Sequence, residues 1–159
     1  AVSSLAVAEC MILVGWNNGA VHSVYLPCPQ SSLACSLRDP QGSKTMAVAL
    51  GGGVCAAALQ NHVDVWDHSG SRRVCLGAPV SALCFHNEFL FVSTGGRIAV
   101  WDVQVSCLVG TLKQHDGALV SLGWHKGGII YTTIAKTDGA TRCENHLNVW
   151  RRRPPVCVG

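Results

Sequence analysis

The chain has 159 residues, of which 48% are hydrophobic and 13% are charged, and its formal net charge is +3. The hydrophobic content can supply the core of one domain, while the charged fraction is about half of the roughly 25% found in ordinary globular proteins. The sequence therefore buries much of its surface or belongs to something larger that covers it. The arginines at 151–153 account for the whole net charge, and beside two prolines they indicate a solvated tail and not a nucleic-acid footprint.

The nine cysteines are odd in number and scattered, and the sequence contains no Asn-x-Ser/Thr glycosylation site. Both observations fit a reducing compartment, so we expect an intracellular protein, cytoplasmic or nuclear. Cys55, Cys75, Cys84 and Cys107 each lie inside a strand-like run, which predicts that they act as small hydrophobic residues.

The longest uncharged apolar run extends from Met46 to Leu59 and carries three glycines, 51–53, in its middle. It is shorter than the roughly 20 residues that a membrane-spanning helix needs, so it predicts two buried strands around a tight turn. The N-terminus lacks the basic region of a signal peptide and does not begin with Met. We therefore expect a fragment, or a chain whose true start is missing.

Alternating apolar runs, separated by Gly, Asn and Asp, predict strands along the chain and leave no room for a helix. The first group of strands is expected at 2–7, 11–15, 20–26 and 32–37. The second group is expected at 44–50, 54–60, 62–66 and 72–77, and the third at 80–85, 89–94, 97–102 and 106–112. The fourth group has strands at 118–124, 129–135 and 147–150, with a longer loop at 136–145.

A short sequence phrase recurs in each group: a Gly or Asn, a spacer, an aliphatic residue, a second spacer and two bulky residues. Its copies begin at Gly19, Asn61, Gly96 and Asn145, and their last residues fall at positions 24, 66, 101 and 150. A period of roughly 40 residues built from strands is typical of propeller blades. The sequence therefore predicts an all-β propeller of consecutive four-stranded antiparallel blades, at approximately 1–38, 43–77, 79–113 and 115–159.

In two copies the last residue is a Trp that is followed by Asp, as Val65-Trp66-Asp67 and Val100-Trp101-Asp102. They resemble the dipeptide that closes the third strand of WD repeats, and the stretch from His115 to Trp124 resembles the opening of such a repeat. The resemblance covers essentially the whole chain, although Val24 replaces the Trp in the first unit. It implies a non-catalytic scaffold that binds other proteins or peptides, with no cofactor, no small-molecule substrate and no membrane insertion.

In that family a His, a Ser or Thr of the second strand, an Asp and the Trp form a hydrogen-bonded set that pins each blade. Only the fourth unit has the His, and the resemblance implies a set of His115, Thr132 or Thr133, Asp138 and Trp150. The other units must rely on apolar packing between sheets. The resemblance assigns structural roles, not ligand contacts, to Trp66, Asp67, Trp101, Asp102, His115 and Trp150.

Four units pose a problem of closure. Propellers have about four to eight blades, and WD-repeat propellers usually have seven, which requires roughly 300 residues. We therefore expect four consecutive blades of a larger propeller. An incomplete ring leaves two apolar blade faces uncovered.

Sequence patterns that could indicate a ligand site or catalysis are much weaker than the repeat. Gly42-Ser43-Lys44-Thr45 is similar to the end of a phosphate-binding loop, but it lacks the second Gly and precedes a predicted strand, so it is interpreted as an interblade loop. Cys143-x-x-His146 has metal-ligand spacing, yet zinc needs a second pair of ligands. No Gly-x-Ser-x-Gly elbow is present. We expect no catalytic residue, cofactor site or metal site.

In a propeller, loops that join each fourth strand to the next first strand share one face with the loops between second and third strands. This face is a common partner platform of the family. In this chain it is expected to carry the cations Arg38, Arg97, Lys113, Lys136 and Arg142. Such a rim suits an acidic or phosphorylated peptide, and ordinary solvated loop charges are the alternative interpretation.

Two further functions stay open. A substrate-recognition module of a ubiquitin ligase predicts an F-box or similar adaptor segment upstream. A nucleic-acid-associated role would depend on the arginines at 151–153 and predicts binding that weakens steeply with salt.

Overall fold

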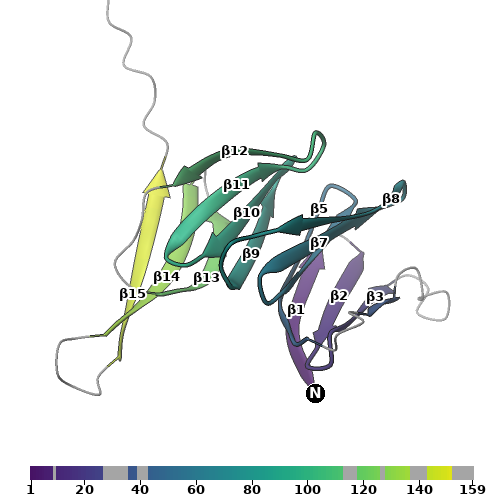
Figure 1. Ribbon diagram of the computed structural model, residues 1–159, viewed down its shortest axis with the longest axis horizontal. Coiled ribbons are helices and arrows are strands. Elements are labelled where there is room, and N and C mark those ends of the chain that lie inside the picture. Colours follow the sequence, from purple (N-terminus) through teal and green to yellow (C-terminus); the bar gives the residue numbers. More distant parts are fainter. Residues whose placement is uncertain are drawn as a thin grey trace, which may run out of the picture.

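The computed structural model describes residues 1–8, 10–26, 36–38, 43–112, 118–125, 128–136 and 143–151. The backbone alone is described at 36–38, 118, 130, 132–136 and 143–151. The regular elements of these residues are all strands, arranged in separate antiparallel sheets that follow one another along the chain (Figure 1). No helix in this part of the chain is long and apolar enough to cross a membrane.

Each sheet is a meander of strands that are neighbours in sequence. The first sheet contains β1 (Val2–Ala8), β2 (Met11–Trp16), β3 (Ala20–Tyr25) and β4 (Ser36–Arg38). The second contains β5 (Thr45–Gly51), β6 (Val54–Leu59), β7 (His62–Asp67) and β8 (Gly70–Cys75). The third contains β9 (Val80–His86), β10 (Phe89–Thr94), β11 (Arg97–Asp102) and β12 (Cys107–Leu112). The fourth contains β13 (Ala118–His125), β14 (Gly128–Lys136) and β15 (Cys143–Arg151).

Glycine pairs set the register of two hairpins. Gly51 pairs with Val54, and the turn residues Gly52 and Gly53 have φ angles of 57° and 75°. Positive φ at both central residues defines the tight turn that matches the twist of antiparallel strands, and glycine adopts it without strain. The apolar run from Met46 to Leu59 is therefore two strands around a turn, as predicted. Gly95 and Gly96, with φ angles of 52° and 81°, make the corresponding turn between β10 and β11.

The core consists of three apolar layers, each between successive sheets. Leu13 and Val21 of the first sheet pack against Trp66 and its neighbours in the second. Val63 and Val65, on the opposite face of the second sheet, pack against the third, where Trp101 borders the cluster. A third cluster joins the third and fourth sheets. Successive sheets thus bury apolar faces against each other, which is how propeller blades are stabilised.

Polar links between the first strands reinforce this stacking. The strands β1, β5, β9 and β13 pack side by side in that order, so the sheets form an arc with the first and fourth at its ends (Figure 1). The Ser4 hydroxyl of β1 accepts a hydrogen bond of 3.0 Å from the Val48 backbone N–H of β5. In the same way, the Ser81 hydroxyl of β9 donates to the Leu119 carbonyl of β13.

Two tryptophan side chains, Trp66 and Trp101, lie between sheets with their indole N–H groups unengaged by any described residue. The Nε1 atoms of Trp66 and Trp101 are buried and have no hydrogen-bond partner among the described residues. A buried, unsatisfied donor costs about 1–3 kcal/mol. Apolar burial must therefore offset this cost in the second and third sheets. The set predicted around His115 involves side chains outside those that the structure describes.

The fourth sheet corrects the predicted strand boundaries. A loop was expected at 136–145, but β14 continues to Lys136 and β15 begins at Cys143, where these two residues pair. The hairpin connection is therefore limited to 137–142, outside the described residues. The prediction was wrong because backbone pairing continues through polar positions such as Glu144 and Asn145, which an apolar pattern does not detect. In the first sheet, β4 covers Ser36–Arg38, whereas a strand was expected at 32–37.

The cysteines also differ from expectation. Cys55 is buried in the second sheet, as a small hydrophobic residue would be, but Cys75 and Cys107 are exposed on outer strands. They are exposed because the fourth strand of a blade has no outer neighbour to cover it. Burial raises the pKa of the Cys84 thiol, although a backbone hydrogen bond with Trp124 partly opposes this effect. None of the five cysteines whose side chains the structure describes forms a disulfide bond, namely Cys10, Cys55, Cys75, Cys84 and Cys107.

Candidate protein-binding faces

The turns that the structure describes gather on two opposite faces. The Val80 N–H donates to the Gln60 carbonyl at 2.7 Å, and the Leu76 N–H donates to the Asn61 carbonyl at 2.8 Å. These bonds hold the β8–β9 connection against the β6–β7 turn. We call this side, with the β10–β11 turn and the start of β5, the Arg97 face. It therefore carries both kinds of loops that were predicted to share one face, namely those from a fourth strand to the next first strand and those between second and third strands.

Arg97 is the first residue of β11 and is exposed. It pairs with Thr94 across the two-glycine turn, so the backbone that carries it is tightly held. No described carboxylate forms an ion pair with its guanidinium group. Lys44, directly before β5 on the same face, is also exposed and without an ion pair in the described part of the chain. Among the described residues, no acidic side chain neutralises these two cations.

The other cations predicted for this face are placed only in part. Arg38 ends β4 and pairs with Ala20, which begins β3, so its position lies at the Arg97 face. Lys136 ends β14 beside the hairpin to β15, which is the equivalent end of the fourth sheet. Lys113 and Arg142 lie outside the described residues. A role in binding stays a prediction for all five cations.

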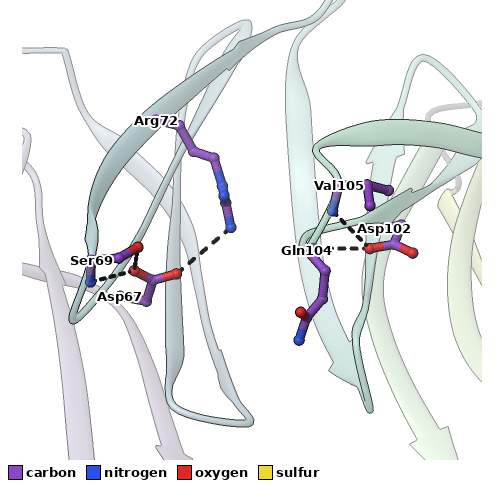
Figure 2. Close-up of polar contacts among 6 residues, drawn as sticks. All are labelled: Asp67, Ser69, Arg72, Asp102, Gln104 and Val105. Carbon is purple, nitrogen blue, oxygen red and sulfur yellow. Dashed lines mark hydrogen bonds and ion pairs between the residues drawn. The ribbon is translucent and has the colours of Figure 1, made fainter.

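The opposite side, which we call the Asp67 face, carries the turns between first and second strands and between third and fourth strands. Asp67 ends β7, and its carboxylate accepts a hydrogen bond of 2.7 Å from the Ser69 N–H and a second bond from the Ser69 hydroxyl. The Arg72 guanidinium lies 3.7 Å from the same carboxylate. Figure 2 shows this arrangement, in which one side chain closes its own hairpin turn.

Asp102 repeats this arrangement in the third sheet. Its Oδ1 accepts hydrogen bonds from the backbone N–H groups of Gln104 at 2.8 Å and Val105 at 3.3 Å (Figure 2). The Asp of each Trp-Asp dipeptide therefore caps the turn that follows its strand. Asp67 and Asp102 therefore have a local structural role in their own turns.

These contacts change the acidity of Asp67. The hydrogen bond from the Ser69 hydroxyl lowers the pKa of the Asp67 carboxyl below 3.8, and the Ser69 N–H lowers it further. Desolvation opposes them, while the positive charge of Arg72 also favours the carboxylate. Asp67 is thus held in its charged form, in which it can accept all of these bonds.

A cavity of about 320 Å³ lies between the second and third sheets on the Asp67 face. Its wall includes Gly52, Gly53, His68, Arg72 and Gln104. It is open and mixed in polarity, and the charged groups in its wall, Asp67 and Arg72, already engage each other. This arrangement gives the cavity little free charge with which to select a ligand.

Sequence reasoning missed an ion pair inside the second sheet. The Asp64 carboxylate accepts two hydrogen bonds from Arg73, from Nε at 2.7 Å and from the terminal nitrogen at 2.9 Å. The two residues are direct cross-strand partners in β7 and β8. Their opposite charges, spaced symmetrically about the 68–69 turn, were the available signal. The pair leaves Arg73 engaged, in contrast to Arg97.

The described residues contain no cluster of three or more metal-ligating side chains. Ser43 and Lys44 precede a strand that begins at Thr45, which agrees with the interpretation of an interblade loop. Cys143 and His146 both lie within β15, where only the backbone is described.

No protein-family model and no curated protein matches the chain. Among solved structures, U3-55K matches with a TM-score of 0.75 at 16% identity, over 95% of this chain and 49% of its own. The WD40 repeats of RRP9 match with a TM-score of 0.72 at 15% identity, over 84% of this chain and 45% of theirs. The computationally designed Ika4 protein matches with a TM-score of 0.68 at 18% identity, over 95% of this chain and 91% of its own.

These likenesses show the fold. The chain is an all-β array of consecutive antiparallel blades of the WD-repeat propeller type, as its sequence predicted. It spans about half the length of the RRP9 and U3-55K structures that it matches.

Proposed function

We propose that this chain is a non-catalytic protein-interaction scaffold whose Arg97 face binds an acidic segment of a partner protein. The observation that carries the proposal is that Arg97 is exposed beside a tight two-glycine turn and has no carboxylate partner in the described structure. A guanidinium in this state can form two parallel hydrogen bonds with a carboxylate or phosphate.

The distribution of charge supports this choice of face. On the Asp67 face, Arg72 is paired with Asp67, and within the second sheet Arg73 is bonded to Asp64. Arg97 and Lys44 on the Arg97 face have no ion pair with any described residue, and the positions of Arg38 and Lys136 add two more basic residues there. An acidic ligand therefore meets unneutralised positive charge on the Arg97 face and compensated charge on the other.

The experiment measures the binding of fluorescent peptides by anisotropy. The probes are a glutamate-rich peptide, the same peptide with phosphoserines, and a glutamine-substituted version. We expect the acidic peptides to bind and Arg97→Gln to weaken them about tenfold, because a charge-assisted hydrogen bond contributes about 1.5–3 kcal/mol. The matched control is Arg72→Gln, which removes the same charge from the opposite face.

Equal weakening by Arg97→Gln and Arg72→Gln would mean that net charge alone drives binding, and would remove the site from the Arg97 face. Equal binding of the acidic and glutamine peptides would contradict charge recognition altogether. The ubiquitin-ligase and nucleic-acid alternatives stay predictions. A labelled DNA duplex belongs in the same titration, because tighter binding of the duplex than of the peptides would favour the nucleic-acid role.

A further inference from the structure

Two cavities on the Asp67 face adjoin the turn between β5 and β6, one on each side of it. The larger, of about 320 Å³, lies between the second and third sheets. The smaller, of about 130 Å³, lies between the first and second sheets and is bordered by Met11 and Leu50. Gly52, Gly53 and Val54 belong to the walls of both cavities. The turn is thus a ridge with a recess on either side.

The ridge has no side chain at its tip that would hold a ligand away. A Cβ atom added at Gly53 would meet no atom within 4 Å, and one added at Gly52 would meet only the Asn87 carbonyl oxygen, at 3.9 Å. Both glycines have positive φ, and glycine also lets another backbone approach closely. The residues that make the tight turn therefore allow a polypeptide to pass over it, from one recess to the other.

The smaller recess is apolar. Met11, Tyr25 and Leu50 contribute to its wall, and none of its described wall residues is charged. Tyr25 is 46% exposed, so a ligand that covers it removes apolar surface from water. This recess suits an aliphatic side chain.

The larger recess holds opposite charges that offset each other. Arg72 lies 3.7 Å from the Asp67 carboxylate, so this pair adds no net charge to the wall. An anionic ligand would be repelled by Asp67 and a cationic one by Arg72. The pair therefore disfavours a charged ligand of either sign.

Gln104 supplies the uncharged polar group of the same recess. Its side-chain amide forms no hydrogen bond with a described residue. Figure 2 shows it on the side of the third sheet, across from Arg72 on the second. An amide has both donor hydrogens and an acceptor oxygen, so it can bond reciprocally with another amide. This recess suits a neutral amide side chain.

We propose that the two recesses and the glycine turn bind one extended, uncharged peptide segment of a partner protein. An aliphatic side chain occupies the smaller recess, and a Gln or Asn two residues away occupies the larger. Side chains two positions apart in an extended chain lie on the same side, about 6.6 Å from each other. A peptide fits better than separate small ligands because the recesses share one ridge. The site is opposite the Arg97 face and selects a neutral ligand, so it is independent of the proposed binding of an acidic segment.

The test is an NMR titration of the isotopically labelled 159-residue chain with short peptides. The probe is Gly-Leu-Ser-Gln-Gly with both ends blocked, and two further versions have Glu or Lys in place of Gln. We expect the uncharged probe to shift the signals of Gly52, Gly53 and the Gln104 side chain in a saturable way. The charged versions are expected to bind at least about tenfold more weakly, because they lose a hydrogen bond and disturb an ion pair.

Variants at Gln104 test the recognition directly, since its side chain is exposed and outside the core. Gln104→Ala is expected to weaken binding of the uncharged probe about tenfold. Gln104→Glu retains the shape and adds a negative charge, so the Lys version should become the tightest of the three. The matched control, Arg97→Gln on the opposite face, is expected to leave all three affinities unchanged. Because it weakens the acidic peptides at the Arg97 face, it also separates the failure of one site from the failure of the other.

Shifts confined to other parts of the chain, or no saturable shift at millimolar peptide, overturn the proposal. Equal binding of the three versions overturns it as well, and so does unchanged binding to Gln104→Ala. A last comparison adds blocked leucine and blocked glutamine as separate molecules. If they bind as tightly as the linked peptide, the recesses are independent sites for small ligands and the proposal fails. A gain of at least about tenfold on linkage supports one peptide that spans both recesses.

Discussion

The two faces of the first sheet are built from the same strands and meet opposite environments. Leu13 and Val21 on the inner face are fully buried, whereas Leu5 and Val7 on the opposite face, called the open face because no described sheet covers it, are more than half exposed. Strand alternation decides which residues share a face. Burial, however, depends on a neighbouring sheet, so the same pattern produces a core on one side and an accessible apolar surface on the other.

The largest expected effect separates the two faces directly. Leu13→Ala is expected to lower the free energy of unfolding by about 2–5 kcal/mol, because it leaves a cavity in the layer between the first two sheets. Leu5→Ala, the matched change on the open face, is expected to cost less than about 0.5 kcal/mol. Urea denaturation followed by circular dichroism measures both. Similar losses would show that the open face is covered within a single chain.

A close approach of backbone to side chain gives the next effect. A Cβ atom added at Gly15 would lie 2.6 Å from Thr45 Cγ2 and 3.1 Å from Val48 Cγ1, so the Thr45 side chain or the packing of the first two sheets must shift to admit it. Gly15→Ala is therefore expected to cost about 1–3 kcal/mol. Gly110 of β12 has no atom within 4 Å of such a Cβ, and Gly110→Ala is expected to be neutral within about 0.5 kcal/mol. The melting temperatures of both variants measure these effects. An equal fall in both would mean that the loss comes from replacing glycine in a strand and not from the contact with Thr45.

The sequence predicted the third sheet best. The strands Phe89–Thr94 and Arg97–Asp102 have the expected boundaries, because short turns interrupt the apolar pattern on both sides. The fourth sheet was predicted less well, since pairing extends to Lys136 and Cys143 through polar residues that carry no apolar signal. Local composition marks a strand where side chains pack, and it fails where the backbone ladder alone continues.

The sequence predicted where Arg97 lies in the fold, but it did not predict which cations form ion pairs. The repeat placed Arg97 at a turn between second and third strands, where the structure has it. The difference between Arg97, which has no ion pair among the described residues, and the engaged Arg73 is not visible in composition, because it depends on Asp64 lying directly across the hairpin; only the spacing of the two charges about the turn indicated it. Pairing between strands, which requires register, decides which cation is neutralised.

The Asp67 face offers a prediction that depends on pH. Asp67→Ala removes the acceptor for the two Ser69 bonds and the partner of Arg72, so we expect a loss of stability at neutral pH that is smaller than that of Gly15→Ala. Because the pKa of Asp67 is lowered on folding, its contribution is fully present above the unfolded value of about 3.8. It is lost as the pH falls through the lower folded value.

Chemical denaturation of the wild type and Asp67→Ala between pH 7 and pH 2.5 measures this dependence. The difference in stability between the two proteins should be constant above about pH 5 and shrink below about pH 4. Ser69→Ala is the matched control, because it removes the largest cause of the lowered pKa and retains the carboxylate. The stability of Ser69→Ala should therefore fall less than that of the wild type as the pH is lowered. A difference that persists unchanged to pH 2.5 would assign the effect to packing and not to the charged carboxylate.

The smallest expected effect on stability belongs to Arg97. Its side chain is exposed and forms no ion pair in the described structure, so Arg97→Ala should change the free energy of unfolding by less than about 0.5 kcal/mol. Arg73→Ala, its matched control, leaves Asp64, which is 9% exposed, without its bidentate partner and should be more destabilising. Thermal unfolding of both variants at equal concentration measures the difference. Equal destabilisation would mean that Arg97 has a structural task, whereas a silent Arg97→Ala leaves this cation available for a partner.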